Sequence, residues 1–547
     1  MRLRTAGAGL ASLLSLGALA AGTLAGCSAP AVSGNFIGGV AGTTITLEGP
    51  NQWTQSGSSF GRPWDQLVAE FKKVTGVTVN TDVLPLATFS SVESAQLAAG
   101  IAPDLVFNQA TYQPYMVVPL NKYLSQPNPF VAGHKSWLSE FDQSAFSAKV
   151  SGTLDSSGNF DWVPFNLVGI AMYYNKTAFK RAGITAPIST FSQLIGDCGA
   201  LAKAGYTPIA MDNSAIGIVF PYRPILDQLM QKRFNELNHF TVTGAPGQAP
   251  ELTTKDLVWG IATGKFSAGD PYVKESMVLL KQLFDSCATK NWSGITGLSG
   301  DGVGLPQFES GQAAMTFAVD FGYGTIAASA HFPIGSMPFP EITTATTTLS
   351  ANVPARSGNS TSGTSYMIPA HTSGNALKAS LLFLQFMSAP QYVTNWLAET
   401  GGIPAIQGIT PPASSAGYFE GAWGKPEIIN LFGCCGYDIA PGVLFSEAYD
   451  GYLLGSKTLG QEVTYLEGLF QQGAAYLVRN DGWTGQPWAS SLPSSAVARR
   501  RRGRSAAQPA ASMRRAASAV TSGSSVRDRY VGPWARRRAR ATKASML

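Results

Sequence analysis

One segment of the chain, residues 161–184 with the sequence DWVPFNLVGIAMYYNKTAFKRAGI, constrains the fold more than any other. It begins with a turn and continues into β-branched and aromatic residues such as Val168 and Tyr173, which predict a strand. Asn175 then stands where its side-chain oxygen can accept an orphan backbone N–H at the start of a helix. Gly183 suits the end of that helix because glycine adopts positive φ at little cost. The segment therefore predicts a strand that passes directly into a capped helix.

Strands and helices alternate along the rest of the chain. In the first part, the expected strands are 43–47, 77–83 and 104–107, and the expected helices are 64–75 and 90–99. In the later part, the expected helices are 191–204, 222–237, 253–263, 273–289, 376–387 and 390–399, and the expected strands are 208–211 and 313–319. This βαβ order predicts an α/β fold with mainly parallel sheets covered by helices.

The N-terminus has the features of a bacterial secretion signal. Two arginines precede an apolar stretch at 10–24 that is too short to span a bilayer. The sequence LAGC that follows matches the bacterial lipobox, in which the cysteine, here Cys27, is lipidated after cleavage. We expect a lipoprotein signal peptide at 1–27, a flexible tether at 28–42, and a mature protein anchored outside the cell membrane. The alternative is an ordinary signal peptide with an incidental cysteine.

The C-terminal segment 491–547 differs sharply in charge from the rest. It contains 13 Arg and one Lys against a single acid, Asp528, whereas residues 28–490 contain 23 basic and 32 acidic side chains. Such a block of like charge with few apolar residues is expected to be disordered. It could adhere to anionic lipid or wall polymer, or it could be a non-native extension, for instance from a frame error.

The cysteines and histidines do not predict a metal site. Cys198 and Cys287 each fall in a predicted helix and could form a disulfide in an oxidising compartment. Cys434 and Cys435 are adjacent, no C-x-x-C spacing occurs, and the four histidines are scattered. We therefore expect neither a metal nor any other cofactor.

Several motifs, in order along the chain, resemble those of family 1 extracellular solute-binding proteins, the receptors of ABC sugar importers. The matching segments are 64–71 with 77–79, APDLV at 102–106, P-x8-YYNK-x2-F-x2-AG at 164–183, FESGQAAM at 308–315, and 379–398 with GGIPA at 401–405. The region 408–437 departs from the family pattern, and the loop 240–250 looks inserted.

The resemblance implies a two-lobed, periplasmic-binding-protein-like (type II) fold in which the chain crosses between lobes several times. The first lobe would hold 43–163 with 314–362, and the second would hold 164–313 with 363–490. A cleft between the lobes would close on a ligand by hinge motion.

Ligands of such folds bind beyond the carboxyl ends of the strands, so the loops there supply candidate contacts. The candidates are Gln52, Trp53, Asn108, Gln109, Phe165, Asn166, Asp212, Asn213, Asp320, Phe321, Tyr323 and Tyr449. Amides, carboxylates and aromatic rings are the mixture that sugars need, because hydroxyls require paired donors and acceptors and ring faces stack on C–H patches. Only Arg62, Arg223 and Arg356 lie near loop positions, which favours a neutral solute.

A secreted hydrolase is the rival interpretation. The sequence GSSFG at 57–61 matches the G-x-S-x-G nucleophile motif, but the preceding strand is expected to end about nine residues earlier, so the sharp strand–turn–helix is missing. A glycosidase would need two facing carboxylates, for which Asp212, Asp320 and Glu309 are candidates. A ligand-sensing lipoprotein is a third possibility.

Taken together, these features predict a monomeric, lipid-anchored receptor that delivers a mono- or oligosaccharide to an ABC permease. We expect it to have no catalytic residue of its own and to bind no nucleic acid.

Overall fold

The computed structural model describes residues 39–51, 59–150, 152–155, 157–214, 216–295, 302–357, 363–429, 439–440, 443 and 445–493. Outside the described residues lie the predicted signal peptide with Cys27, most of the predicted tether, Gln52, Trp53, Cys434, Cys435 and the tail from 494 onward. Within the described part of the chain, no helix is both long and apolar enough to cross a membrane.

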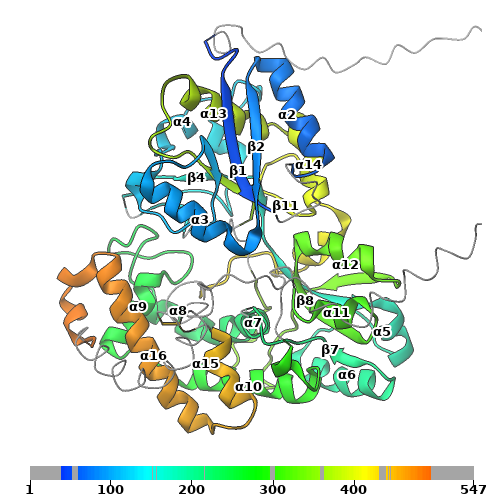
Figure 1. Ribbon diagram of the computed structural model, residues 1–547. Helices are drawn as coiled ribbons and strands as arrows, with labels where there is room; N and C mark the ends of the chain where they lie inside the picture. Colours follow the sequence, from blue (N-terminus) through cyan, green and yellow to red (C-terminus); the bar gives the residue numbers. More distant parts are fainter. Residues whose placement is uncertain are drawn as a thin grey trace, which may run out of the picture.

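The chain folds into two α/β lobes, one above the other in the view of Figure 1. The upper, first lobe contains a five-stranded sheet in the order β2-β1-β3-β10-β4. Its strands are β1 (Thr44–Pro50), β2 (Thr78–Leu84), β3 (Leu105–Phe107), β4 (Trp162–Pro164) and β10 (Ser365–Met367). The first three run parallel, as predicted, and β10 is antiparallel to both β3 and β4.

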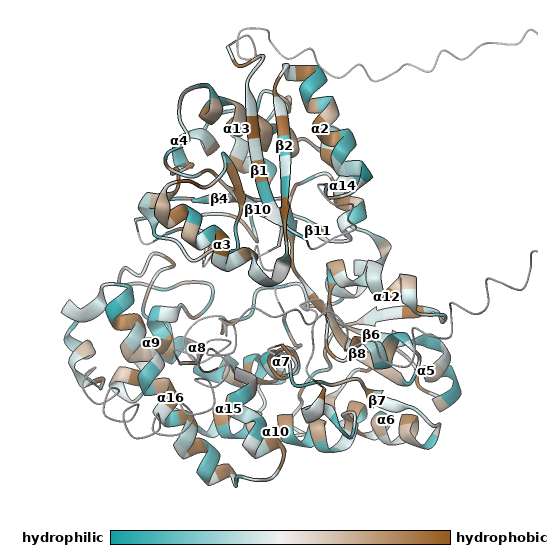
Figure 2. Ribbon diagram, viewed as in Figure 1, coloured by the Kyte–Doolittle hydropathy of each residue, from teal (hydrophilic) through white to brown (hydrophobic). Residues whose placement is uncertain are grey.

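Five helices cover this first sheet. They are α2 (Arg62–Thr75), α3 (Leu86–Ala99), α4 (Asn121–Leu124), α13 (Gly374–Met387) and α14 (Pro390–Thr400). Helix α2 turns hydrophilic residues outward (Figure 2) and buries Trp64, whose ring lies 5.0 Å from that of Trp396 on α14. Trp64 and Trp396 thus bring the early and the late segment of this lobe together in one hydrophobic core.

The second lobe contains a four-stranded sheet in the order β7-β8-β6-β9. Its strands are β6 (Ile170–Asn175), β7 (Thr207–Ile209), β8 (Ala313–Val319) and β9 (Ile334–Met337). Its helices are α5 (Lys176–Ala182), α6 (Phe191–Lys203), α7 (Val219–Met230), α8 (Phe234–Leu237), α9 (Thr254–Thr263), α10 (Pro271–Cys287), α11 (Leu305–Glu309), α12 (Tyr323–Ser329), α15 (Phe445–Leu453) and α16 (Leu459–Asn480). Here the predicted helix 222–237 is divided between α7 and α8.

Two local predictions for this lobe are confirmed. The Asn175 side chain accepts hydrogen bonds from the backbone N–H groups of Thr177 (2.9 Å) and Ala178 (3.1 Å), which caps α5. The helix ends at Gly183, where φ is 71°. A disulfide joins Cys198 on α6 to Cys287 on α10. The cap and the helix end follow from local residue chemistry, whereas the sequence leaves open whether these two cysteines, 89 residues apart, are paired.

The predicted division of the chain between the lobes is wrong after residue 313. Strand β8 pairs with β6 in the second lobe, from Ile170 opposite Val319 to Tyr174 opposite Met315, so 314–357 belongs there. Conversely, β10, α13 and α14 pack in the first-lobe core. The chain returns to the second lobe after about Ile406, since Tyr418 and later aromatic residues lie in that core. The sequence assigns these segments to the wrong lobes because a fully buried strand has no polar–apolar alternation that would indicate which sheet it joins.

Candidate functional site

The junction between the lobes is built from three crossing segments. The first contains β5 (Asn166–Leu167) and another contains β11 (Ile403–Pro404); between them in sequence, the described chain leaves the second lobe at Ser357 and resumes at Gly363, next to β10 of the first lobe. Strands β5 and β11 form a two-stranded antiparallel ribbon, which lies between the two larger sheets (Figure 1). A short ribbon of this kind can bend while both lobes stay rigid, so it is the candidate hinge.

Asn166, in β5, is hydrogen-bonded to Thr364, just before β10, and to Thr400, at the end of α14. It is 1% exposed, its Oδ1 accepts a hydrogen bond from the backbone N–H of Thr364, and its Nδ2 donates to Thr400 Oγ1 at 3.4 Å. A Cβ added at Gly402 would lie only 2.3 Å from Asn166 Nδ2, so this position requires glycine. The predicted contact of Asn166 with a ligand is therefore replaced, in this structure, by contacts within the hinge.

Asp320 ties the other side of the ribbon. It is 1% exposed, and its carboxylate accepts hydrogen bonds from the backbone N–H groups of Gly169 (3.3 Å) and Ile403 (2.7 Å). Burial raises the pKa of Asp320 to about 7, although these backbone donors favour the charged form. One side chain thus connects the crossing before β6 to the crossing at β11.

Four more residues that the sequence predicts to contact a ligand have side chains that instead contact other residues of the chain. Phe165 lies in the first-lobe core, with its ring 5.9 Å from that of Tyr366. The carboxylate of Asp212 accepts from the N–H groups of Ser214 (3.0 Å) and Gly304 (2.6 Å). Asn213 donates to Asp450 (3.0 Å), and the hydroxyl of Tyr449 lies 3.4 Å from that of Tyr222. These side chains hold the second lobe and the junction together in the present arrangement.

The remaining described candidates keep accessible side chains. Asn108 is half-buried and Gln109 is exposed, and both follow β3 as the sequence predicts. Phe321 and Tyr323 are half-buried after β8, and the Tyr323 ring lies 5.7 Å from that of Tyr173. An amide pair and an aromatic pair therefore follow one strand of each lobe, and a solute held between the lobes could contact both.

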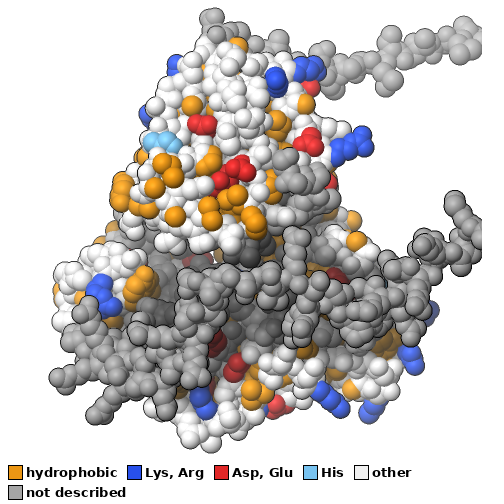
Figure 3. Space-filling model, in the orientation of Figure 1, with side chains coloured by type: hydrophobic (Ala, Val, Ile, Leu, Met, Phe, Trp, Pro, Cys, Tyr) orange, Lys and Arg blue, Asp and Glu red, His pale blue; other side chains and the backbone are white. Residues whose placement is uncertain are grey.

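The surface of the first lobe near the junction is apolar. Hydrophobic side chains gather along the lower edge of the upper lobe in Figure 3, over the region of α3. The exposed large hydrophobic residues of this lobe include Val92, which lies on α3, and Ile101 and Tyr115, which follow it in sequence. The only charged residue of α3, Glu93, is fully buried instead. Burial, together with the smaller effect of the nearby Glu48, raises the pKa of Glu93 to about 9.

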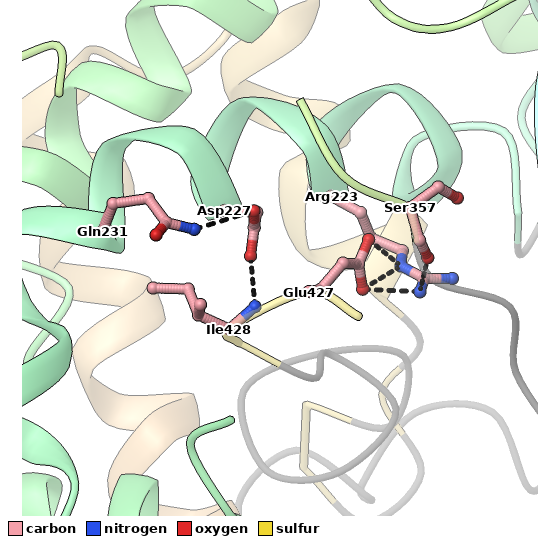
Figure 4. Close-up of polar contacts among 6 residues, drawn as sticks. All are labelled: Arg223, Asp227, Gln231, Ser357, Glu427 and Ile428. Atoms are coloured by element: carbon pink, nitrogen blue, oxygen red, sulfur yellow. Dashed lines mark hydrogen bonds and ion pairs between the residues drawn. The ribbon is translucent and has the colours of Figure 1, made fainter. Parts of the chain in front are cut away.

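Arg223, which the sequence places near a loop, lies inside the second lobe. Its guanidinium donates from Nε and Nη2 to the Glu427 carboxylate, with a shortest distance of 2.6 Å, and from Nη2 to the Ser357 carbonyl at 3.3 Å (Figure 4). The adjacent Asp227 accepts from the Ile428 backbone N–H at 2.6 Å. Arg223 is only 6% exposed, so its charge is neutralised by an ion pair inside the lobe. The sequence does not indicate this ion pair.

The serine of the G-x-S-x-G motif has a structural role. The Ser59 hydroxyl donates to Asp65 at 2.5 Å and accepts from the Gly61 backbone N–H at 3.1 Å, which fixes the entry to α2. Within the described residues, no group of three or more His, Cys, Asp or Glu side chains could hold a metal ion.

The chain thus has two lobes joined by a two-stranded ribbon, with polar and aromatic side chains after strands of both lobes, an arrangement suited to holding a small molecule. Comparison with known proteins agrees: the chain belongs to the bacterial extracellular solute-binding protein family, whose model matches residues 55–394. This family is defined by solute binding, and the protein is accordingly a binding protein and not an enzyme.

Two curated relatives match part of the chain. The sn-glycerol-3-phosphate-binding periplasmic protein UgpB of Pectobacterium atrosepticum is 31% identical over 159 residues, which is 28% of this chain and 35% of the relative. The erythritol/L-threitol-binding protein of Mycolicibacterium smegmatis is 26% identical over 204 residues, which is 35% of this chain and 41% of the relative. The matches thus span well under half the length of either relative.

Solved structures share the fold over a greater length. The solute-binding protein RafE, solved in complex with raffinose and also from Streptococcus pneumoniae in its apo form, is similar to this chain. The raffinose complex has a TM-score of 0.55 at 17% identity, and the match covers 78% of this chain and 98% of that structure. At this identity the likeness establishes the two-lobed fold alone.

Proposed function

We propose that the protein is a lipid-anchored extracellular receptor that captures a neutral carbohydrate, a mono- or oligosaccharide or a related polyol, and delivers it to an ABC importer. The observation that carries this proposal is the pairing of accessible amides after β3 (Asn108, Gln109) with accessible aromatic rings after β8 (Phe321, Tyr323). Amides can match adjacent hydroxyls, while rings stack on the C–H faces of a sugar.

The pairing of Arg223 favours a neutral solute. A phosphorylated solute would require an available basic group, and Arg223 is paired with Glu427 in the lobe interior. Arg356 is the contrary case, because its Nε is buried without a hydrogen-bond partner among the described residues. The names of the relatives include both kinds of solute, a polyol and a glycerol phosphate, so phosphorylated solutes belong in the experiment as the contrary case.

The proposed mechanism needs no chemistry from this chain. The solute binds between the open lobes, the ribbon of β5 and β11 bends, and the closed form docks on a permease pair whose partner subunit hydrolyses ATP. Lipidation of Cys27 would keep the monomeric receptor at the outer face of the membrane, within reach of the permease. The alternative, a ligand-sensing lipoprotein, would bind the solute and close in the same way but would not deliver the solute to a permease.

A thermal-shift panel on the full-length protein tests this proposal. The panel contains monosaccharides, raffinose, erythritol, ribitol and glycerol 3-phosphate, followed by calorimetry of each hit. A solute at 100 times its dissociation constant should stabilise the protein by about 2.7 kcal/mol. Tyr323→Ala should weaken the same binding by about 1–3 kcal/mol, whereas Tyr465→Ala, an exposed tyrosine on α16, should not change it.

The outcomes separate the alternatives. A neutral hit that is not consumed supports the receptor. A response to glycerol 3-phosphate alone would contradict the neutral-solute proposal. Slow consumption of a sugar would point to a hydrolase, and equal binding by Tyr323→Ala would remove that residue from the site.

A further inference from the structure

The first lobe contains a cavity of about 220 Å³ beside β4 that the proposed function does not use. Its walls come from Tyr112 and Pro114 after β3, from residues 152–155, and from Asp161 and Trp162 at the start of β4. The cavity belongs to one lobe, so its occupation does not depend on hinge closure. Pockets for drug-sized ligands measure roughly 300–1,000 Å³, so this cavity suits a smaller molecule.

One oxygen of the Asp161 carboxylate, beside the cavity, lacks a hydrogen-bond donor in the described part of the chain. The residue is 4% exposed, and its Oδ1 is buried without a hydrogen-bond partner among the described residues. Asp155 is different, because its Oδ1 already accepts from the backbone N–H groups of Ser157 (2.7 Å) and Asn159 (2.8 Å). A buried carboxylate oxygen without a donor is unfavourable, so a ligand that brings a donor to Asp161 would be stabilised there.

The electrostatic surroundings of the cavity are acidic. Burial, followed by the negative charges of Asp161, Asp155 and Glu93, raises the pKa of Tyr112. Burial and the charge of Asp155 raise the pKa of Asp161 to about 7, against a hydrogen bond from Tyr112 that lowers it. The described residues that line the cavity include no lysine or arginine. A positively charged ligand would therefore reduce the repulsion among the acidic groups around the cavity.

We infer that this cavity binds a small organic ammonium ion, whose N–H groups donate to Asp161 and whose charge lies against the rings of Tyr112 and Trp162. Aromatic faces attract cations, and Tyr112 and Trp162 are among the residues that line the cavity. A calcium ion is less suited, because it takes six to eight oxygen ligands and the described lining offers only two carboxylates, Asp155 and Asp161. This inference is independent of the solute bound between the lobes.

Isothermal titration of the full-length protein with ethanolammonium and with ethylene glycol tests the inference. The two probes differ in one group, an ammonium in place of a hydroxyl. We expect saturable binding of ethanolammonium at least tenfold tighter than any binding of ethylene glycol. Asp161→Asn should weaken it at least tenfold, while Asp82→Asn, which removes an exposed acid of the same lobe, should leave it unchanged.

A second readout separates binding from fold damage. Because Asp161 is partly protonated near neutral pH, ammonium binding should release protons, which calorimetry detects as a dependence on the buffer's ionisation enthalpy. If Asp161→Asn does not fold, Tyr112→Ala, at a half-buried position, should weaken binding at least fivefold. Equal binding of the two probes, tighter competition by Ca²⁺, or unchanged affinity in Asp161→Asn would overturn the inference.

Discussion

Asp320 is the residue on which the hinge depends most directly, since its two oxygens accept from backbone groups on two crossing segments. In Asp320→Asn, the amide nitrogen would face one of these N–H donors and leave it unsatisfied. We expect the free energy of unfolding to fall by about 1–3 kcal/mol in urea denaturation. Asp285→Asn, at an exposed surface ion pair, should change it by less than about 1 kcal/mol. Equal effects of the two substitutions would contradict the proposed role of Asp320 in linking the two crossing segments.

Arg223 and Glu427 form a buried pair whose removal should be strongly non-additive. Arg223→Met leaves a carboxylate in the lobe interior and should cost about 3–5 kcal/mol of unfolding free energy. The double variant Arg223→Met/Glu427→Leu should recover most of that loss, because neither charge is then buried alone. A double variant less stable than Arg223→Met would show that the pair stabilises the fold beyond mutual neutralisation. Urea denaturation of all three proteins measures the coupling.

At the scale of elements, the disulfide between α6 and α10 closes a long loop, since its cysteines are 89 residues apart. Loss of this link should lower the free energy of unfolding by about 2–4 kcal/mol. Denaturation of the protein with and without dithiothreitol measures this effect. Cys198→Ser/Cys287→Ser is the matched control, and it should unfold at the same urea concentration with or without reductant. An unchanged midpoint on reduction of the parent protein would contradict the prediction.

Elements defined by local signals are predictable from this sequence, and their partners are not. The strand–helix unit of β6 and α5 follows from Asn175 and Gly183, whose effects reach only a few residues. Strand β8 also has its predicted bounds, yet all seven residues are buried, so no alternation indicates which sheet it joins. The candidate site shows the same limit. Asp212 and Asp320 follow strands as predicted, but a short carboxylate there reaches a backbone N–H as readily as a ligand.

At the scale of the whole molecule, buried carboxyl groups should make the protein more stable in mild acid. Burial raises the pKa of Glu93 to about 9 and those of Glu140 and Asp161 to about 7. Each group binds its proton more tightly in the folded than in the unfolded chain. Its stabilising contribution is therefore present below pH about 4 and is lost as pH rises through the folded pKa.

We accordingly expect the free energy of unfolding to fall by at least about 2 kcal/mol between pH 5 and pH 8. Urea denaturation at several pH values measures this slope. Glu93→Gln should flatten it, because Glu93 has the most strongly raised pKa of the three groups. A slope of the opposite sign would contradict the assignment of these carboxyls as protonated groups.

We propose that two rigid lobes close around a neutral solute by bending at the ribbon of β5 and β11. Small-angle X-ray scattering of the full-length protein, titrated with the sugar or polyol that calorimetry selects, tests this closure. We predict that the radius of gyration falls as solute is added and saturates with the calorimetric dissociation constant. A radius that stays constant while calorimetry shows saturated binding would contradict capture by hinge closure.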